Sequence, residues 1–218
     1  MKPWLDLPIE SDKKYINFMN FLAHLYLSGT SEGLIIGNFI GDSVKGRDLN
    51  RYAKKVQEGI ILHRKIDFFT DHHPIAERSK KRIRKEFRKY TPVIIDVFYD
   101  HFLATNWDVY SKEALNNYVK NTYQLLEQNS ASFPERAQYM LPFMITQNWI
   151  ENYKTIEGIK KALTGLAGRT RFKSNMELAH NSLEKEYKGL GEDFKLFFPE
   201  LIDYVESLGY PIRKAHWG

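Results

Sequence analysis

His63, Asp67 and Asp71 are spaced four residues apart in the segment HRKIDFFTDHHP, at residues 63–74. On an α-helix each step of four residues advances about 40° around the axis, so these side chains form one slanting row. Such a row can supply imidazole and carboxylate ligands to a metal ion, or it can be the solvated edge of a helix. Asp71 lies close to the helix-breaking Pro74, where capping or an outer contact competes with ligation.

A second group lies in the segment PVIIDVFYDHFLA. Asp96 and Asp100 are four residues apart and therefore share a helix face, whereas His101 is rotated by about 100° from Asp100. Apolar residues surround all three, and burying an unpaired carboxylate is costly. We therefore expect a compensating partner, which is either a metal ion held by at least one of Asp100 and His101, or a buried basic or hydrogen-bonding residue.

Two weaker signals precede these segments. His24 lies in the nearly all-apolar stretch NFLAHLYL, where a lone histidine is more often a satisfied core residue than a ligand. Asp42 follows Gly41, which can let the backbone approach a ligand, although a helix cap or turn would also explain the pair. Together the four segments supply enough imidazole and carboxylate for one or two metal ions in a helical bundle.

The composition limits what such a site can contain. The chain has 218 residues, 43% of them hydrophobic, and no composition break, which predicts one globular domain. It has no cysteine, so a metal would be held by imidazole and carboxylate, which favours Mn²⁺ or Mg²⁺ and leaves Zn²⁺ and Fe²⁺ possible. No signal-peptide pattern and no run of about 18 apolar residues occurs, so we expect a soluble, cytoplasmic protein.

The apolar periodicity is helical throughout, which predicts an all-α, single-domain bundle. Ser31 can cap the second helix, and Pro74 and Pro92 can begin the fourth and fifth. The expected helices cover residues 17–28, 31–46, 49–70, 74–90, 92–107, 111–128, 133–146, 152–166, 174–188 and 191–206.

Three blocks carry a family resemblance: MNFLAHLYLSGTSEGLIIGNFIGDSVKG at 19–46, GIILHRKIDFFTDHHP at 59–74 and PVIIDVFYDHFLA at 92–104. In order and separation they resemble the bacterial acyl carrier protein phosphodiesterases, and the similarity continues more loosely through 141–172. The resemblance implies a divergent, Mn²⁺-dependent relative of the HD-type phosphohydrolases. Its members hydrolyse the phosphodiester that joins 4′-phosphopantetheine to a serine of holo-acyl carrier protein.

The resemblance also implies roles for individual residues. The implied metal ligands are Asp42, His63, Asp67 and Asp100, with His24 as a further candidate. The implied catalytic residues are Asp67 and His101, the latter as an outer support or as the proton donor to the departing serine oxygen. The adjacent pair here reads Asp-His, the reverse of the order that gives the HD superfamily its name.

The segment RSKKRIRKEFRK at 78–89 has eight basic residues among twelve, which predicts a helix with a strongly positive outer face. Such a face, including Arg82 and Lys85, would steer an acidic acyl carrier protein, although a solvated basic helix without a partner is the simpler interpretation. An anionic membrane would also suit a net charge of +5. RNA is disfavoured because no RNA-binding motif accompanies the patch. Further candidate contacts to the phosphate or phosphopantetheine are Arg64, Arg169 and Arg171.

Two other functions remain open. One is a different HD-type phosphohydrolase acting on a nucleotide or small phosphodiester, with base-stacking aromatics drawn from Phe68, Phe69, Phe98 and Tyr99. The other is a non-catalytic helical module that binds an acidic protein. In either case we expect residues 1–18 to be an extension and residues 19–218 to form the domain.

Overall fold

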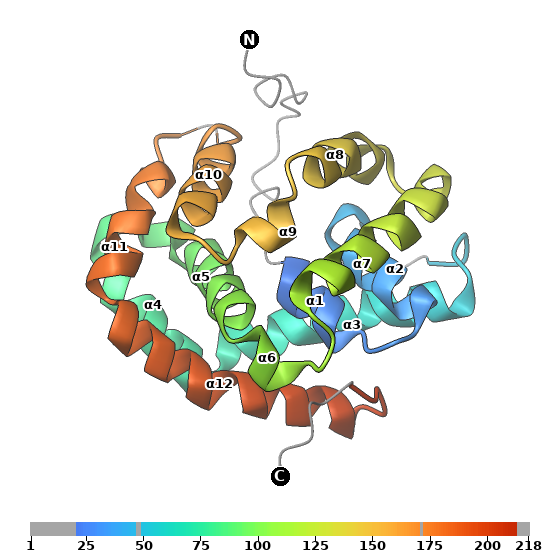
Figure 1. Ribbon diagram of the computed structural model, residues 1–218, viewed down its shortest axis with the longest axis horizontal. Helices are drawn as coiled ribbons and strands as arrows, with labels where there is room; N and C mark the ends of the chain where they lie inside the picture. The colour runs from blue at the N-terminus through green and yellow to red at the C-terminus, as the bar shows by residue number, and fades with distance from the viewer. Residues whose placement is uncertain (1–20, 47–48, 171, 213–218) are drawn as a thin grey trace.

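The computed structural model describes residues 21–46, 49–170 and 172–212, and within them it contains helices and no strand. The all-α prediction is therefore confirmed. Figure 1 shows the helices arranged around a central pair, α1 and α5. The α-helices are α1 (Phe21–Leu27), α2 (Glu32–Ile40), α3 (Lys54–His72), α4 (Pro74–Phe87), α5 (Thr91–Thr105), α6 (Trp107–Tyr110), α7 (Leu115–Asn129), α8 (Glu135–Thr146), α9 (Trp149–Asn152), α10 (Ile156–Ala167), α11 (Ala179–Lys185) and α12 (Tyr187–Ser207). Short 3-10 turns are η1 (Gly41–Ser43), η2 (Arg88–Tyr90), η3 (Ser130–Ser132) and η4 (Met176–Leu178).

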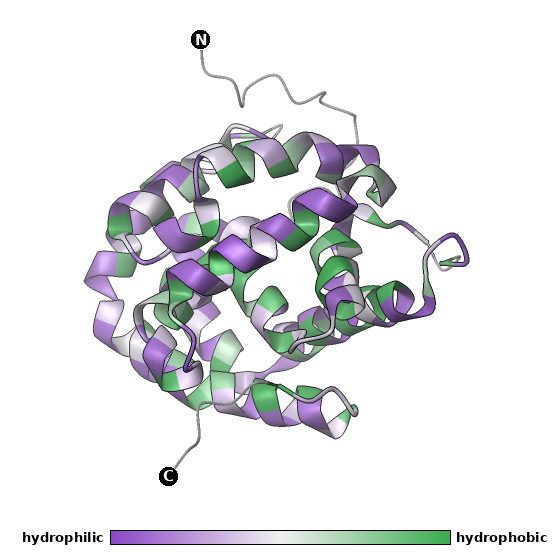
Figure 2. Cartoon of the chain, turned by 45° about the vertical axis from the view of Figure 1, so that its right-hand side comes forward, coloured by the Kyte–Doolittle hydropathy of each residue, from purple (hydrophilic) through white to green (hydrophobic). Residues whose placement is uncertain are grey.

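Helices α1 and α5 lie at the centre because almost all their side chains are apolar. In α5 the residues from Val97 to Ala104 are all buried, and in α1 only Ala23 is partly exposed. A helix that is hydrophobic on every side must be enclosed by others. Figure 2 shows hydrophobic residues on the inward sides of the surrounding helices and hydrophilic residues outside. The polar residues of α1 and α5 are consequently held in the interior.

Helices α2 and α3 cross with their backbones in contact. A Cβ atom on Gly37 would lie 2.1 Å from the carbonyl oxygen of Val56 and 2.8 Å from the Cα of Gly59. A side chain at either glycine would therefore push the helices apart. This close crossing brings the polar residues of α2 and η1 against those of α3.

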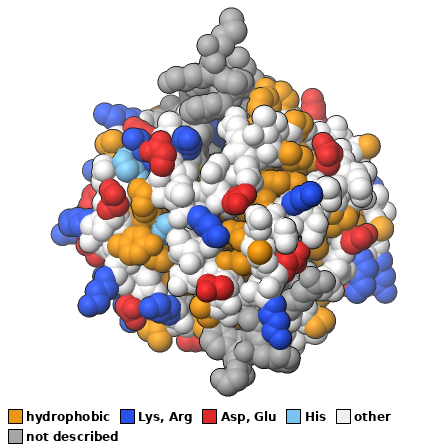
Figure 3. Space-filling view, in the orientation of Figure 1, with side chains coloured by type: hydrophobic (Ala, Val, Ile, Leu, Met, Phe, Trp, Pro, Cys, Tyr) orange, Lys and Arg blue, Asp and Glu red, His pale blue; other side chains and the backbone are white. Residues whose placement is uncertain are grey.

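Helix α4 packs on α12 through a buried carboxylate, so part of its predicted positive face is used within the bundle. Asp193 of α12 is 1% exposed and accepts hydrogen bonds from Arg78 Nε at 2.6 Å and Arg82 Nε at 2.9 Å. Arg84 forms a bidentate pair with Glu77. Basic and acidic side chains are interspersed on the face seen in Figure 3. Much of the positive charge of α4 thus holds the bundle together.

The predicted helices are observed with trimmed ends. Pro74 is the first residue of α4 and Pro92 the second of α5, as predicted. Ser31 occupies the N-cap position of α2, but its side chain makes no capping hydrogen bond. The short helices α6 and α9 were not predicted, and residues 1–18 lie outside the described part of the chain. No helix among the described residues has the length and apolar character needed to cross a membrane.

Candidate metal centre

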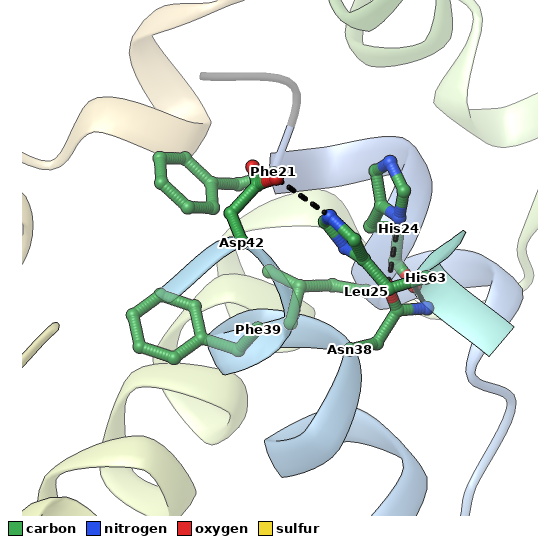
Figure 4. A pocket seen from close by; sticks show the side chains of 7 residues that line it. All are labelled: Phe21, His24, Leu25, Asn38, Phe39, Asp42 and His63. Atoms are coloured by element: carbon green, nitrogen blue, oxygen red, sulfur yellow. Dashed lines mark hydrogen bonds and ion pairs between the residues drawn. The ribbon is translucent and has the colours of Figure 1, made fainter. Parts of the chain in front are cut away.

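Two histidines from different helices share one hydrogen-bond acceptor. His24 of α1 and His63 of α3 are 2% and 5% exposed, and their ring centroids are 4.2 Å apart. Asn38 Oδ1 of α2 lies 2.7 Å from His24 Nδ1 and 3.0 Å from His63 Nδ1. Figure 4 shows both imidazoles directed at this amide in a small pocket that Phe21 and Phe39 also line.

The other ring nitrogens of these histidines face carboxylates. His24 Nε2 is 3.2 Å from Asp67 Oδ1, and His63 Nε2 is 3.4 Å from Asp67 Oδ2. The same nitrogen of His63 also lies 3.1 Å from Asp42 Oδ1 of η1. Gly41 permits this approach, because a Cβ there would lie 2.4 Å from His63 Cγ. Four predicted site residues from three elements, α1, η1 and α3, therefore meet in one cluster.

The cluster has the donor set of a cation site. His24 Nε2 and His63 Nε2 are buried and have no hydrogen-bond partner among the described residues. Since both Nδ1 atoms face an acceptor, each neutral ring presents a lone pair to a carboxylate oxygen, an arrangement that needs a positive charge between them. His24, His63 and Asp67 each offer a ligand atom within 4.8 Å of the others. Two imidazoles and two carboxylates fit Mn²⁺, Fe²⁺ or Zn²⁺.

The electrostatics agree with that geometry. Burial opposes protonation of His63, but Asp67 and Asp42 outweigh it and raise its pKa above the ordinary value. Burial likewise disfavours ionised Asp67, yet His63 and His24 hold the pKa of this carboxyl below its ordinary value. Both shifts describe a site that attracts a proton or another cation to the space between the rings and the carboxylates.

Asp100 lies beside this cluster and is bonded elsewhere. Its side chain is fully buried, and its two oxygens accept the backbone N–H groups of Leu22 at 3.0 Å and Ala23 at 2.8 Å. Burial raises the pKa of Asp100 to about 7 although these N–H groups favour the charged form. In the described structure Asp100 therefore holds the start of the helix that carries His24, and its role as a ligand stays a prediction.

His101 also lies outside the cluster, and both its nitrogens are engaged. Its Nδ1 donates to the carbonyl oxygen of Tyr153 at 2.7 Å, so its Nε2 accepts from the hydroxyl of Tyr187 at 3.0 Å. Burial lowers the pKa of this imidazole. These hydrogen bonds suit a supporting role for His101 better than a proton-donor role, and both stay predictions.

Two more predicted residues have structural partners. Arg64 Nη2 donates to the carbonyl oxygens of Val44 at 3.0 Å and Gly46 at 2.9 Å, which fastens the loop after Asp42. Asp71, near the end of α3, pairs with the buried Lys80 at 2.9 Å rather than with the histidines. Arg82 is committed to Asp193 as described above.

Sequence reasoning overlooked three residues at the site. Asn38 is the one polar residue in the otherwise apolar stretch GLIIGNFI, at 33–40, which was the available signal. Asp96 was recognised as a neighbour of Asp100 but was not selected; burial and the nearby Asp67 raise its pKa to about 8. Arg136 of α8 carried no sequence signal. Its pKa is lowered by burial and raised by Asp42, which places its charge beside the cluster.

Arg169 is the predicted substrate contact that the structure leaves most available. Its Nε is buried without a hydrogen-bond partner among the described residues, and its guanidinium lies 5.7 Å from the centre of the Trp149 ring. Burial and the nearby Arg136 lower the pKa of Arg169 to about 10. Arg171 lies outside the described residues.

Comparison with known proteins connects this site to a class of hydrolase. The sequence profile described as acyl carrier protein phosphodiesterase matches residues 19–201. A protein of that name from Photorhabdus laumondii is 30% identical over 190 residues, covering 87% of this chain and 96% of its own length. One from Salmonella paratyphi A is 31% identical over 185 residues, covering 84% and 96%. One from Yersinia enterocolitica is 27% identical over 190 residues, covering 87% and 98%.

The fold and these relatives define an all-α phosphodiesterase. The chain belongs to the acyl carrier protein phosphodiesterase family, which confirms the resemblance found in the sequence. No solved structure matches it.

Proposed function

We propose that this protein hydrolyses the phosphodiester between 4′-phosphopantetheine and a serine of holo-acyl carrier protein, giving the apo-protein and free 4′-phosphopantetheine. Water supplies the oxygen that joins phosphorus, and the bond from phosphorus to the serine oxygen breaks. The observation that carries the proposal is the pair of buried, unpartnered Nε2 atoms of His24 and His63 facing Asp67 and Asp42. Family membership supports the choice of substrate.

The cluster would hold a divalent cation through His24, His63, Asp67 and Asp42, and we propose Mn²⁺ as the physiological ion. When bound, such an ion withdraws charge from a phosphate oxygen and makes water a stronger acid. Mn²⁺ is favoured over Zn²⁺ by the absence of cysteine and by the equal share of oxygen and nitrogen donors. Asp100 positions His24 by holding α1, and Arg64 positions Asp42 by holding the loop after it.

Arg136 and Arg169 are suited to receive the phosphate of the substrate. Two guanidinium groups close to one another repel, and Arg169 has no carboxylate partner among the described residues. A phosphodiester would relieve this repulsion and accept the N–H group at Nε of Arg169. Because Arg136 also lies near Asp42, an anion held there would be adjacent to the cation site. Arg171 stays a predicted contact next to Arg169.

The acidic carrier protein would meet basic residues that are not used inside the bundle. Lys85 is exposed and forms no ion pair with any described residue, whereas Arg82 is held by Asp193. Electrostatic steering by residues such as Lys85 accelerates encounter with an acidic partner and weakens with salt. We propose that the encounter takes place in the cytoplasm.

A nucleotide as substrate is less well supported. Of the four aromatic residues considered for base stacking, Phe98 and Tyr99 are buried, and Phe69 stacks on Tyr204 with ring centroids 4.5 Å apart. Of these four side chains only Phe68 is exposed, at 64%, and one face of its ring lies against His72. One exposed ring offers a weak platform compared with the phosphate contacts.

The decisive experiment incubates the purified protein with holo-acyl carrier protein and Mn²⁺ and records the intact mass of the carrier protein. Loss of the phosphopantetheine mass, prevented by a chelator and by Asp67→Ala, is the expected result. Asp71→Ala is the matched control, because Asp71 lies one turn further along α3 and pairs with Lys80. An unchanged mass with a metal-loaded protein would refute the proposed function and leave the hydrolase of a nucleotide or small phosphodiester and the non-catalytic binding module.

A further inference from the structure

Asn38 is fixed in one orientation between the two histidines. Its Nδ2 donates to the backbone carbonyl of His24 at 2.8 Å and lies 3.0 Å from the hydroxyl of Ser28. Ser28 in turn donates to the same carbonyl of His24 at 2.9 Å, so its oxygen is free to accept from the amide. Since a carbonyl oxygen can only accept, the amide cannot be flipped, and Oδ1 must point at the imidazoles.

This orientation determines which nitrogen carries the proton in both rings. A carbonyl oxygen has two lone pairs, and the two Nδ1 atoms at 2.7 Å and 3.0 Å occupy both. Each Nδ1 must therefore be protonated, and each neutral ring keeps its Nε2 lone pair for the space between His24, His63, Asp67 and Asp42. One buried amide sets the tautomer of both histidines at once.

The alternative tautomer would remove the need for a cation. With the proton on Nε2, His24 would donate to Asp67 across the present 3.2 Å, and His63 would donate to Asp42 across the present 3.1 Å. Two histidine–aspartate hydrogen bonds would then satisfy the cluster internally. Asn38 prevents this, because the Nδ1 lone pairs would be pressed against its carbonyl oxygen.

We propose that Asn38 is a positioning residue that fixes the tautomer of both neutral histidines and so holds them ready for Nε2 ligation. This inference rests on the proposed function only in requiring that the cluster binds a divalent cation. Residues that orient metal-bound histidines typically contribute about 10- to 100-fold in metal affinity. A single amide serving two ligands should lie at the upper end of that range.

The test compares three variants by ¹⁵N NMR of the imidazoles in metal-free protein and by calorimetric titration with Mn²⁺. Asn38→Leu keeps the approximate volume and removes the acceptor, so the proton should move to Nε2 and Mn²⁺ affinity should fall by about 100-fold. Asn38→Asp keeps an acceptor for both rings, so it should preserve the tautomers and most of the affinity while losing the contact to the His24 carbonyl. Ser28→Ala touches neither ring and should change the affinity less than about threefold.

Thermal unfolding separates this role from a merely structural one. Asn38→Asp should be less stable than Asn38→Leu but should bind Mn²⁺ more tightly. The melting temperature of Asn38→Leu should rise little with saturating Mn²⁺. Wild-type affinity in Asn38→Leu would overturn the inference. If Asn38→Leu does not fold, the wild-type spectrum at a pH where both rings are neutral decides alone: a proton on Nδ1 of each ring supports the role, and a proton on Nε2 instead refutes it.

The two proposals fail separately. Asn38-dependent Mn²⁺ binding without hydrolysis of holo-acyl carrier protein would refute the proposed function and leave the inference standing. Hydrolysis that is chelator-sensitive but unaffected by Asn38→Leu would refute the inference and leave the proposed function standing.

Discussion

Two histidine–aspartate groups lie in the interior of this bundle, and only one of them has the features of a metal site. In the first, His63 Nε2 faces Asp42 and Asp67 and makes no hydrogen bond to any described residue. In the second, Asp100 accepts two backbone N–H groups, and His101 uses both ring nitrogens on tyrosine oxygens. The residue types are the same and the histidines are buried in both groups, although Asp42 and Asp67 are partly exposed and Asp100 is not. What separates a ligand from a structural residue is whether its polar atoms already have partners.

The strongest test of this comparison replaces His63 and His101 in turn, because the two replacements should have different effects. His63→Gln should abolish Mn²⁺ binding and reduce hydrolysis by more than about 100-fold, since losing a direct ligand costs more than losing a residue that orients one. His101→Gln should keep the metal and lose stability instead. Metal content and intact-mass assays of both variants check this, and loss of metal from His101→Gln alone would reverse the assignment.

The pH dependence of stability tests the second group. The folded protein raises the pKa of Asp100 from 3.8 to about 7, so the folded state binds this proton more tightly than the unfolded state does. The stability from this group is therefore present at low pH and is lost as pH rises from about 4 to about 7. The loss is at most about 4 kcal/mol, because one pKa unit corresponds to about 1.4 kcal/mol.

Urea unfolding at pH 5 and pH 8 in the presence of chelator measures this difference. Asp100→Asn removes the titrating group and should flatten the dependence. An equal slope in the variant would show that other groups, such as Asp96, carry the effect.

A further comparison sets Arg82 against Lys85 on the same helix. Arg82→Ala leaves the buried Asp193 with Arg78 as its remaining basic partner and should cost up to about 3 kcal/mol, because breaking a buried pair is strongly destabilising. Hydrolysis at saturating carrier protein should be unchanged in the protein that stays folded. Denaturant unfolding and steady-state kinetics together check the prediction.

Lys85→Ala should have the smallest effect of the set. Surface changes usually alter stability by less than about 0.5 kcal/mol. If Lys85 steers the acidic carrier protein, KM should rise a few-fold at low salt and converge with wild type as salt increases. A KM that is unchanged at every ionic strength would remove Lys85 from the docking surface.

The sequence predicted the fold well because its helical periodicity and its prolines are local signals. Pro74 begins α4 as predicted, and the four-residue spacing of His63 and Asp67 did place both at one site. The same local reasoning could not assign Asp100 or Arg82. Their roles depend on the start of α1 and on Asp193, which lie 77 and 111 residues away in the chain. Asn38 escaped notice because its importance comes from two rings that reach it from other helices.

The crossing of α2 with α3 concentrates four separate requirements into the six residues GNFIGD, at 37–42. Gly37 admits the backbone of α3, Asn38 orients both imidazoles, Gly41 makes room for the His63 ring, and Asp42 faces its Nε2. The pattern G-N-x-x-G-D, followed about twenty residues later by H-x-x-x-D, can therefore serve as a search signature. In an uncharacterised genome it would distinguish chains able to build this pocket from helical bundles that share only the fold.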